Sequence, residues 1–353
     1  MSVTREDPAA PRRPATSIDV AERAGVSQST VSRALSGSRT ITEATRQRVE
    51  RAAQELGYHV NARAAGLRKG ETGTIAIVVI GRAGEGARQI NPFYYSLLGN
   101  ACAAAAERGY EALVSFQSEP DEFFGHYVAR RQADGLIVLG TAMNGPAWDY
   151  FRDCAKDNAQ IAFWGSPFDD SAWVRSDNRA GGRAAVERLL KSGARHILFV
   201  GDPAGAQRQY GERYAGYREA MGEAGLDLAD ALVPEDAGDR VDQGRAAARR
   251  ILDLDERPEG LFFACDAMAL GALEEFAAAG VSIPDEIGVV GFDGIDAGAF
   301  SNPPLTTLAP DFGEAGRSLV AMALAPAGME TDNRVPVRLV DRGSVRGEVP
   351  HNG

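Results

Sequence analysis

The sequence predicts a small all-α domain followed by an α/β region that contains two doubly wound parallel sheets. Short helical segments with polar N-cap residues fill residues 16–57, which indicates the all-α domain. From Thr74 onward, apolar runs typical of buried strands alternate with helices. This pattern continues for roughly 230 residues, which is enough chain for two lobes.

Three short helices are expected in the first region. They cover residues 17–24, 28–35 and 43–56, and their N-cap residues are Thr16, Ser27 and Thr42. Gly25 permits a tight turn between the first two helices, and Gly57 ends the third. Three short helices with a glycine turn between the first two are the minimum for a helix-turn-helix domain, which is expected over residues 16–60.

The second of these helices carries candidate DNA-contacting residues. When its apolar side chains pack on the first helix, a polar face remains, and the candidates are Ser27, Gln28, Ser29, Thr30, Ser32 and Arg33. Gln and Arg can bond bidentately to adenine and guanine edges, whereas Ser and Thr can hold phosphate. The alternative is a helical hairpin whose polar side chains are only solvated.

The net charge of the whole chain, −11, argues against nucleic-acid binding, but the distribution of charge along the chain favours a DNA-binding head. Residues 1–70 hold 12 Lys and Arg against 7 Asp and Glu, a net charge of +5, and the rest of the chain carries −16. A basic head on an acidic body can approach phosphate in only one orientation. A solvated basic tail is the alternative interpretation.

Two flanking segments have different expected properties. Residues 1–15 are polar and proline-rich, which indicates a disordered N-terminal arm. Residues 61–73 are expected to form one short helix, about residues 62–67, followed by a linker. A helix of two turns is not stable alone in water, so we expect it to form only where something such as DNA supports it.

The α/β region has alternating expected strands and helices. The expected strands are Ile75–Ile80, Ala112–Phe116, Gly135–Leu139, Ile161–Trp164, His196–Val200, Gly260–Ala264 and Gly288–Gly291. The expected helices include Phe93–Arg108, Gly181–Ser192, Arg213–Ala224 and Met268–Ala279. Open parallel sheets bind ligands at the carboxyl ends of their strands, so a binding site is expected there.

The string from Thr16 to Leu35 resembles the head of the lactose-repressor (LacI/GalR) family, and the resemblance continues through Thr45, Val49 and Leu56 to Asn61. Weaker landmarks of that family lie at residues 91–94, 108–110, 133–137, 213–217, 291–293, 304–308 and 342–344. The resemblance implies a homodimer that binds operator DNA and has a periplasmic-binding-protein-like core at residues 74–345.

The resemblance also implies how the core is divided. Three chain crossings are expected near Val174, Leu305 and Arg334. One lobe would then hold residues 74–174 and 306–333, and the other residues 175–305 and 334–345, followed by a tail at 346–353. The effector of such proteins lies between the lobes.

By the same resemblance, Asn61 begins a hinge helix and Leu67 is its hinge leucine. In relatives, paired hinge leucines wedge open a base step in the minor groove, and an apolar wedge offsets unstacking by bending DNA onto more protein. A leucine that packs on the head is the alternative. Ala65 departs from the family, in which a longer polar residue is common there.

Arg213 and Asp293 match the family's effector-contacting arginine and aspartate. A guanidinium donates and a carboxylate accepts, so the two together can bind adjacent hydroxyls, as in a sugar or a sugar derivative. A structural salt bridge is the alternative. Further candidates for the effector site are Phe93, Tyr94, Trp164, Asp239 and Cys265.

These further candidates are less specific. The three aromatic residues are expected as apolar walls of the site or simply as core. Asp239 and Cys265 depart from the family, because relatives often have an aromatic residue at the first position and Asn or Asp at the second. These departures leave the identity of the effector open.

No catalytic, metal or cofactor site is expected. The three cysteines and four histidines lack metal-ligand or nucleophile spacing, and they are Cys102, Cys154, Cys265, His59, His126, His196 and His351. Gly81, Gly84 and Gly86 follow a strand, but their order and the late helix start disfavour a nucleotide-dependent enzyme.

The remaining alternative is the solute-binding protein of a sugar transporter, which shares the sensor fold. The polar N-terminal segment lacks the apolar core of a secretory signal, and no apolar run is long enough to span a membrane. We therefore expect a cytoplasmic, effector-controlled transcription repressor that acts as a homodimer on double-stranded operator DNA.

Overall fold

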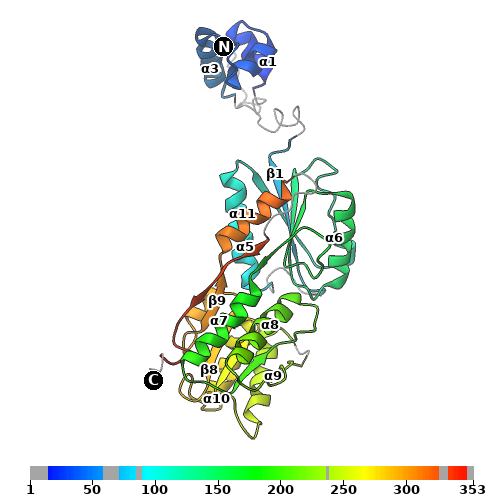
Figure 1. Ribbon diagram of the computed structural model, residues 1–353. Coiled ribbons are helices and arrows are strands. Elements are labelled where there is room, and N and C mark those ends of the chain that lie inside the picture. Colours follow the sequence, from blue (N-terminus) through cyan, green and yellow to red (C-terminus); the bar gives the residue numbers. More distant parts are fainter. Residues whose placement is uncertain (1–14, 59–70, 85–89, 236–237, 326–332, 348–353) are drawn as a thin grey trace, which may run out of the picture. The chain divides into compact units, whose positions relative to one another are not determined.

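The computed structural model describes residues 15–58, 71–84, 90–235, 238–325 and 333–347. The chain forms two compact units, Met1–Thr72 and Gly73–Gly353 (Figure 1). The arm expected at residues 1–15 lies outside the described residues, except for Ala15. Asn61, Leu67 and the short helix expected between them also lie outside the described residues.

The described residues of the first unit form three helices at the positions that the sequence predicts. They are α1 (Ser17–Ala24), α2 (Gln28–Leu35) and α3 (Glu43–Leu56). Thr16 caps α1 in a capping box with Asp19, and Ser27 and Thr42 cap the other two helices. Gly25 ends α1 with φ of 64°, a left-handed conformation in which glycine has no Cβ clash.

One small core holds these helices together. The buried residues that form it are Val20, Ala21, Ala24, Val31, Ala34, Val49, Ala52 and Ala53. Most of these side chains are small, so the helices approach closely, and a salt bridge of 2.6 Å between Arg23 and Glu55 joins α1 to α3 at the surface. This packing leaves the polar side of α2 exposed.

In the part of the second unit that the structure describes, the strands form two sheets. The first has the order β10-β5-β4-β3-β1-β2 with all strands parallel, and its strands are β1 (Thr74–Ile80), β2 (Glu111–Gln117), β3 (Gly135–Gly140), β4 (Ile161–Trp164), β5 (Trp173–Ser176) and β10 (Arg334–Val335). The second has the order β11-β9-β8-β7-β6, and its strands are β6 (Ile197–Val200), β7 (Gly260–Phe263), β8 (Gly288–Phe292), β9 (Thr306–Pro310) and β11 (Val337–Val340). Among these described strands, β11 pairs with β9 in the antiparallel direction and the other pairs are parallel.

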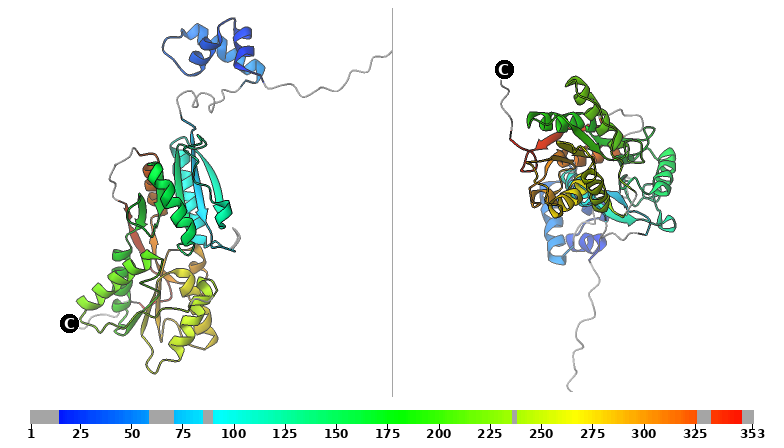
Figure 2. Two further views of the ribbon diagram at one scale, coloured as in Figure 1. Left: turned by 90° about the vertical axis from the view of Figure 1, so that its right-hand side faces the viewer. Right: turned by 90° about the horizontal axis from the view of Figure 1, so that it is seen from below.

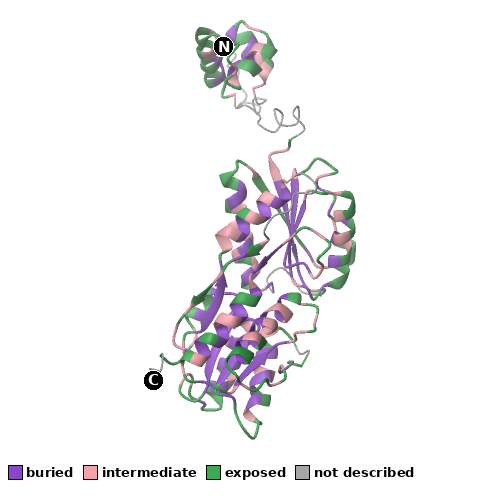
Figure 3. Cartoon of the chain, viewed as in Figure 1, coloured by how far each residue is buried: buried purple, intermediate pink, exposed green. Residues whose placement is uncertain are grey.

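Helices cover both faces of the first sheet (Figure 2). Helices α5 (Pro92–Glu107) and α11 (Phe312–Ala323) pack on one face, and α6 (Gly145–Asp157) packs on the other. Along β1, alternate side chains reach opposite faces: Ile75 joins the core under α5, and Ala76 joins the core under α6. Both faces are therefore buried, which explains the continuous apolar run (Figure 3).

The helices of the second sheet share one core with its strands. They are α7 (Asn178–Lys191), α8 (Arg208–Glu223), α9 (Arg240–Leu252) and α10 (Asp266–Ala278). Short 3-10 turns lie at Pro120–Glu122 and Asp296–Ala299. Within the described ranges, no helix is long and apolar enough to cross a membrane.

The chain crosses between the two lobes slightly later than the resemblance implies. The crossings follow β5, β9 and β10, so lobe 1 comprises residues 73–176 and 311–335, and lobe 2 comprises residues 177–310 and 336–345. Strand β9 was expected in lobe 1, but Thr306 pairs with Val290 of β8, so β9 belongs to lobe 2. Arg334 pairs with Arg175 of β5 and stays in lobe 1.

Candidate functional site

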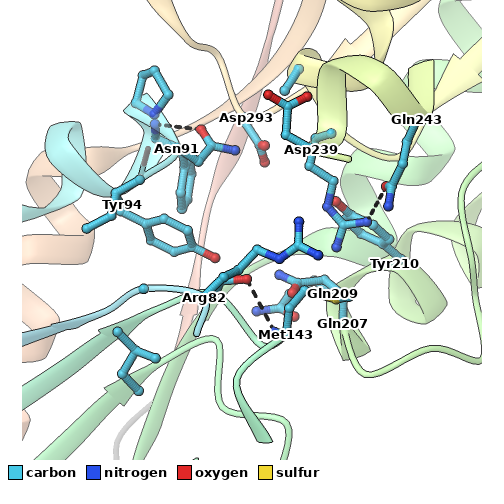
Figure 4. Close-up of a pocket in the computed structure, with 18 of the residues that line it drawn as sticks. Arg82, Asn91, Tyr94, Met143, Gln207, Gln209, Tyr210, Asp239, Gln243 and Asp293 are labelled. Carbon is cyan, nitrogen blue, oxygen red and sulfur yellow. Dashed lines mark hydrogen bonds between the residues drawn. The ribbon is translucent and has the colours of Figure 1, made fainter. Parts of the chain in front are cut away.

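A cavity of about 460 Å³ lies between lobe 1 and lobe 2 (Figure 4). Its lining comes from the segments that follow the carboxyl ends of the strands and from the first turns of the helices beyond them. Such a volume suits a small organic ligand. The position is also the one at which open α/β sheets bind ligands.

Arg213 and Asp293 meet at the lobe 2 side of the cavity. Arg213 Nη2 lies 3.3 Å from Asp293 Oδ1, and both side chains are almost completely buried. Arg213 also donates from Nε to Asn178 Oδ1 at 2.9 Å and from Nη1 to the Ala264 carbonyl, and its guanidinium lies 3.5 Å from the centre of the Phe292 ring. The two residues therefore line the cavity and form a structural ion pair at once.

The environment of Asp293 is unusual in two respects. Burial raises the pKa of Asp293 to about 6, and the neighbouring Arg213 guanidinium opposes this shift. The residue has φ of 119°, a strained conformation for a side chain other than glycine. Its N–H donates to the Leu308 carbonyl at 2.8 Å, which fixes this conformation beside the cavity.

The three aromatic candidates form the lobe 1 wall. Phe93 and Tyr94 lie in the first turn of α5, and Trp164 ends β4. The Phe93 ring lies 6.0 Å from Trp164 and 5.4 Å from Phe312, so it belongs to the lobe 1 core as well as to the cavity. Burial raises the pKa of Tyr94 well above its ordinary value, so its hydroxyl faces the cavity as a neutral group.

Asp239 lines the cavity, but Cys265 does not. The Asp239 carboxylate caps α9 by accepting from the Val241 and Asp242 N–H groups at 2.8 and 3.0 Å. Cys265 is buried at the start of α10 and is hydrogen-bonded to Tyr210, which itself lines the cavity. The expected contact between Cys265 and an effector is therefore not supported, because the thiol lies behind the lining.

The sequence interpretation missed several lining residues. They include Arg82, Gln207, Gln209, Tyr210 and Arg240. Helix α8 begins at Arg208 rather than at the expected Arg213, and its N-cap residue Gln207 makes no side-chain capping bond that would have signalled the start. With the earlier start, Gln209 stands four residues before Arg213 on the same face of the helix.

Gln209 has a feature that the other lining residues lack. It is 7% exposed, and its Nε2 donates to the Gly165 carbonyl of lobe 1 at 2.9 Å. Among the described residues, its Oε1 has no hydrogen-bond partner. A buried acceptor without a partner is costly, so a ligand whose donor reaches this amide of the cavity lining would relieve that cost.

In the head, α2 presents the expected polar face. Ser27, Gln28, Ser29, Ser32 and Arg33 are exposed, and Thr30 is half-buried. Ser27 caps α2 by accepting from the Thr30 N–H at 3.2 Å. The Gln28 side chain bonds to Ser17 Oγ of α1 at 2.9 Å, so its amide is held at the start of α2.

Residues 18–61 match the bacterial regulatory proteins of the lacI family, and residues 186–345 match the periplasmic binding protein-like domain. The HTH-type transcriptional regulator CelR of Thermobifida fusca is 33% identical over 340 residues, which are 93% of this chain and 96% of that protein. The chain belongs to the lacI family of bacterial regulatory proteins. The ribose operon repressor of Escherichia coli (strain K12) is 33% identical over 300 residues, which are 83% of this chain and 87% of that repressor.

Solved structures agree with this assignment. The complex of the transcriptional regulator CelR with cellobiose is 29% identical, has a TM-score of 0.65 and covers 94% of this chain and 99% of its own. The lac repressor dimer bound to operator and the anti-inducer ONPF is 24% identical, with a TM-score of 0.76 and coverage of 95% and 100%. At that identity, the second likeness shows the fold alone.

The family and the fold class predicted from the sequence are thus confirmed. This LacI-family chain is a transcriptional regulator with a helix-turn-helix head and a periplasmic-binding-protein-like core. Its relatives are named as regulators and repressors of transcription rather than as enzymes. In the part of the chain that the structure describes, no cluster of His, Cys, Asp or Glu is arranged to hold a metal ion.

Proposed function

We propose that this LacI-family regulator is a cytoplasmic repressor whose affinity for operator DNA is controlled by a sugar-like effector. The cavity between the lobes carries the proposal, because Arg213 and Asp293 offer donors and a charged acceptor at the carboxyl ends of parallel strands. The related regulator CelR has been solved with cellobiose, a sugar.

The DNA is read by α2. Gln28 and Arg33 contact base edges in the major groove, and the hydroxyls of Ser27, Ser29, Thr30 and Ser32 hold phosphate or bases. Their exposure on a helix that a small core holds rigidly supports this role. Asn61 and Leu67, which lie outside the described residues, are proposed as the start of the hinge helix and its minor-groove wedge.

The effector binds between the lobes. Arg213, Asp293 and Asp239 contact its hydroxyl groups, and Phe93, Tyr94 and Trp164 cover an apolar face of the ring. Two lobes that each supply part of one cavity are drawn together when a ligand contacts both. The ligand can shift operator affinity only by its differential affinity for the two lobe arrangements.

The regulator acts as a homodimer. Strand β2 is the edge of the first sheet, and exposed apolar side chains beside it form an edge patch of Tyr95, Val114 and Phe116. Phe300 on lobe 2 is 88% exposed. Exposed apolar side chains at a sheet edge favour association, and two copies related by a twofold axis read a near-palindromic site.

Electrophoretic mobility shift with promoter DNA of the neighbouring genes tests the regulator. We expect a specific shift that weakens as salt rises, because phosphate contacts release counterions. Calorimetry with cellobiose, ribose, other sugars, nucleosides and carboxylates tests the effector. Absence of any specific shift over a range of salt would refute the regulator, and tight binding of a hydroxyl-poor acid without sugar binding would refute the sugar class.

A further inference from the structure

Glu212 lies on α8 directly before the effector arginine and joins several polar groups. Its Oε2 accepts from Asn178 Nδ2 at 2.8 Å, and its Oε1 lies 3.3 Å from Arg175 Nη1. Arg334 Nη1 lies 3.5 Å from Oε2. Asn178 in turn accepts from Arg213 Nε at 2.9 Å, so a chain of contacts leads from the cavity to Glu212.

This chain of contacts passes from one lobe to the other at the crossings. Asn178 is the first residue of α7, immediately beyond the first crossing in lobe 2. Arg175 belongs to β5 and Arg334 to β10, the two lobe 1 strands that end at the first and third crossings. Glu212 is therefore bonded to the strands on which the relative placement of the lobes depends.

The lobe 1 side of these contacts is fixed. The Arg175 side chain is 1% exposed, and it also donates to the carbonyls of Ser166 and Phe168 at 2.7 and 3.0 Å and to Asp169 at 2.9 Å. Its guanidinium lies 4.1 Å from the centre of the Trp173 ring. Because lobe 1 groups accept from both Nη1 and Nη2 of Arg175, its contact with Glu212 ties a residue of lobe 2 to a fixed group of lobe 1.

The lobe 2 side of these contacts is also largely shielded from solvent. Asn178 is completely buried, and the Glu212 side chain is 16% exposed. Contacts between ionised and polar groups are stronger at low local dielectric, and a buried partner left unpaired is costly. The side-chain amide of Asn178 uses its oxygen for Arg213 and its nitrogen for Glu212, so neither contact can move without the other.

We propose that Glu212 is a positioning residue for effector recognition. Through Asn178 it fixes the orientation of the Arg213 guanidinium, and through Arg175 it ties that group to the crossing strands of lobe 1. A ligand that draws Arg213 into the cavity therefore also displaces Asn178 and Glu212, and so strains the contact between Glu212 and Arg175 that joins the lobes. The role of this contact in signalling rests on the proposed function, whereas its geometry can be tested without DNA or effector.

The test uses Glu212→Gln in the full-length protein and two exchange measurements. Nitrogen-15 NMR of arginine side chains follows solvent exchange of the Arg213 Nε–H. Its resonance is identified as the one that is lost in Arg213→Lys. Hydrogen–deuterium exchange follows the amides of Arg175 and Asp177, which donate to the carbonyls of Asn333 and Val335. We expect both to exchange about tenfold faster in the variant, because a charge-assisted contact is lost on each side.

Two further variants separate the halves of the proposal. Asn178→Ala removes the hydrogen bond to Arg213 but keeps the contact of Glu212 with Arg175. The Arg213 Nε–H should therefore exchange faster, and the amides of Arg175 and Asp177 should not. Glu187→Gln is the matched control, because Glu187 is an exposed glutamate of the same lobe, 3.7 Å from Arg183, and it should change neither measurement. Cooperative thermal unfolding shows that each variant is folded.

Unchanged exchange at the Arg213 Nε–H in folded Glu212→Gln overturns the positioning role. Unchanged exchange at the Arg175 and Asp177 amides overturns the tie between the lobes. Both measurements are made without operator or sugar, so a protein that binds neither can still support this inference. Conversely, failure of the inference leaves the proposed repressor function standing.

Discussion

At the scale of single residues, the lining of the cavity combines structural and binding roles. Arg213 and Asp293 form a buried ion pair, so removal of either one leaves an uncompensated charge, which costs about 3–5 kcal/mol. A loss of effector response in Arg213→Ala therefore mixes lost binding with lost stability. Residues whose side chains are neutral give a cleaner measurement, and Gln209 is the best placed of these.

Gln209→Leu should weaken binding of the tightest sugar in the calorimetric panel about tenfold, because one buried hydrogen bond to the ligand is lost. The prediction follows from the Gln209 side chain, which belongs to the cavity lining and whose Oε1 has no partner in the described part of the chain. Gln132→Leu, which alters an exposed glutamine of lobe 1, is the control. Equal sugar affinity in wild type and Gln209→Leu would exclude this oxygen from recognition.

Asp266 gives a prediction about pH. It is completely buried beside the cavity, where it bonds to Thr307 Oγ1 at 2.6 Å and to the Ile295 N–H at 2.9 Å. Burial raises the pKa of Asp266 from its ordinary 3.8 to about 8, and the nearby Asp293 carboxylate adds to the shift. Between these two values, the folded protein holds a proton that the unfolded chain has released.

The contribution of Asp266 to stability should therefore fall as pH rises from about 4 to about 8 and then become constant. Asp266→Asn cannot release a proton, so the free energy of unfolding should decline less steeply with pH in the variant than in wild type. Urea unfolding at several pH values across this interval measures the difference. Parallel curves for the two proteins would show that Asp266 does not titrate there.

At the scale of elements, local signals predicted some segments well and others poorly. Helices α1 and α2 have the expected bounds because side-chain caps and a glycine turn mark their ends. Strand β1 was visible because burial on both faces requires an unbroken apolar run. In each case, the determining interaction lies within a few residues along the chain.

Elements whose position depends on contacts between distant segments were harder to predict from the sequence. The placement of β9 depends on its pairing with β8, and that of the two-residue strand β10 on its pairing with β5, so neither crossing could be located from its own residues. Helix α8 begins at Arg208 without a side-chain cap, which concealed Gln209 and Glu212 as members of its first turns. Arg213 and Asp293 were predicted through a family resemblance, whereas the burial of Cys265 behind Tyr210 depends on tertiary packing between distant segments.

Helix α2 supports a prediction about DNA sequence reading. Arg33→Ala and Gln28→Ala should weaken the preferred operator more than random DNA, by roughly 1–3 kcal/mol for each lost base contact. Arg48→Ala, an exposed arginine on α3, is the control for a general loss of positive charge. Mobility shifts on both DNAs check this, and equal losses on the two would assign Arg33 and Gln28 to phosphate contacts.

At the scale of the whole molecule, regulation requires that one chain combine a rigid DNA-binding head with a core whose two lobes can change their relative angle. The head is held by a small core of its own, and the two lobes have separate sheets joined by three crossings. The lobes have largely separate cores, although Ile295 of lobe 2 packs into the lobe 1 core. A change in the angle between the lobes would therefore repack only a few side chains, since packed interiors resist deformation. The cavity then lies where such a change is largest, between the lobes.

The same division places the proposed dimer contacts on both lobes. The edge patch of Tyr95, Val114 and Phe116 belongs to lobe 1, and Phe300 belongs to lobe 2. In a dimer joined through both lobes, a change in the angle between lobe 1 and lobe 2 would shift the two subunits relative to each other. That shift would alter the spacing of the two DNA-binding heads. Operator affinity depends on that spacing, because half-sites lie a fixed distance apart on the duplex.

Phe116→Glu should therefore weaken dimerisation about tenfold or more, because a charge replaces an apolar side chain in the proposed interface. Sedimentation velocity over a concentration series measures the association, and operator affinity should fall with it, since two heads bind DNA together only in the dimer. Leu254→Glu is the matched control, because Leu254 is exposed to a similar degree, 42% against 40%, and lies outside the edge patch. If Phe116→Glu remains as dimeric as Leu254→Glu, the edge patch is not the dimer contact, and the heads must be paired through another surface.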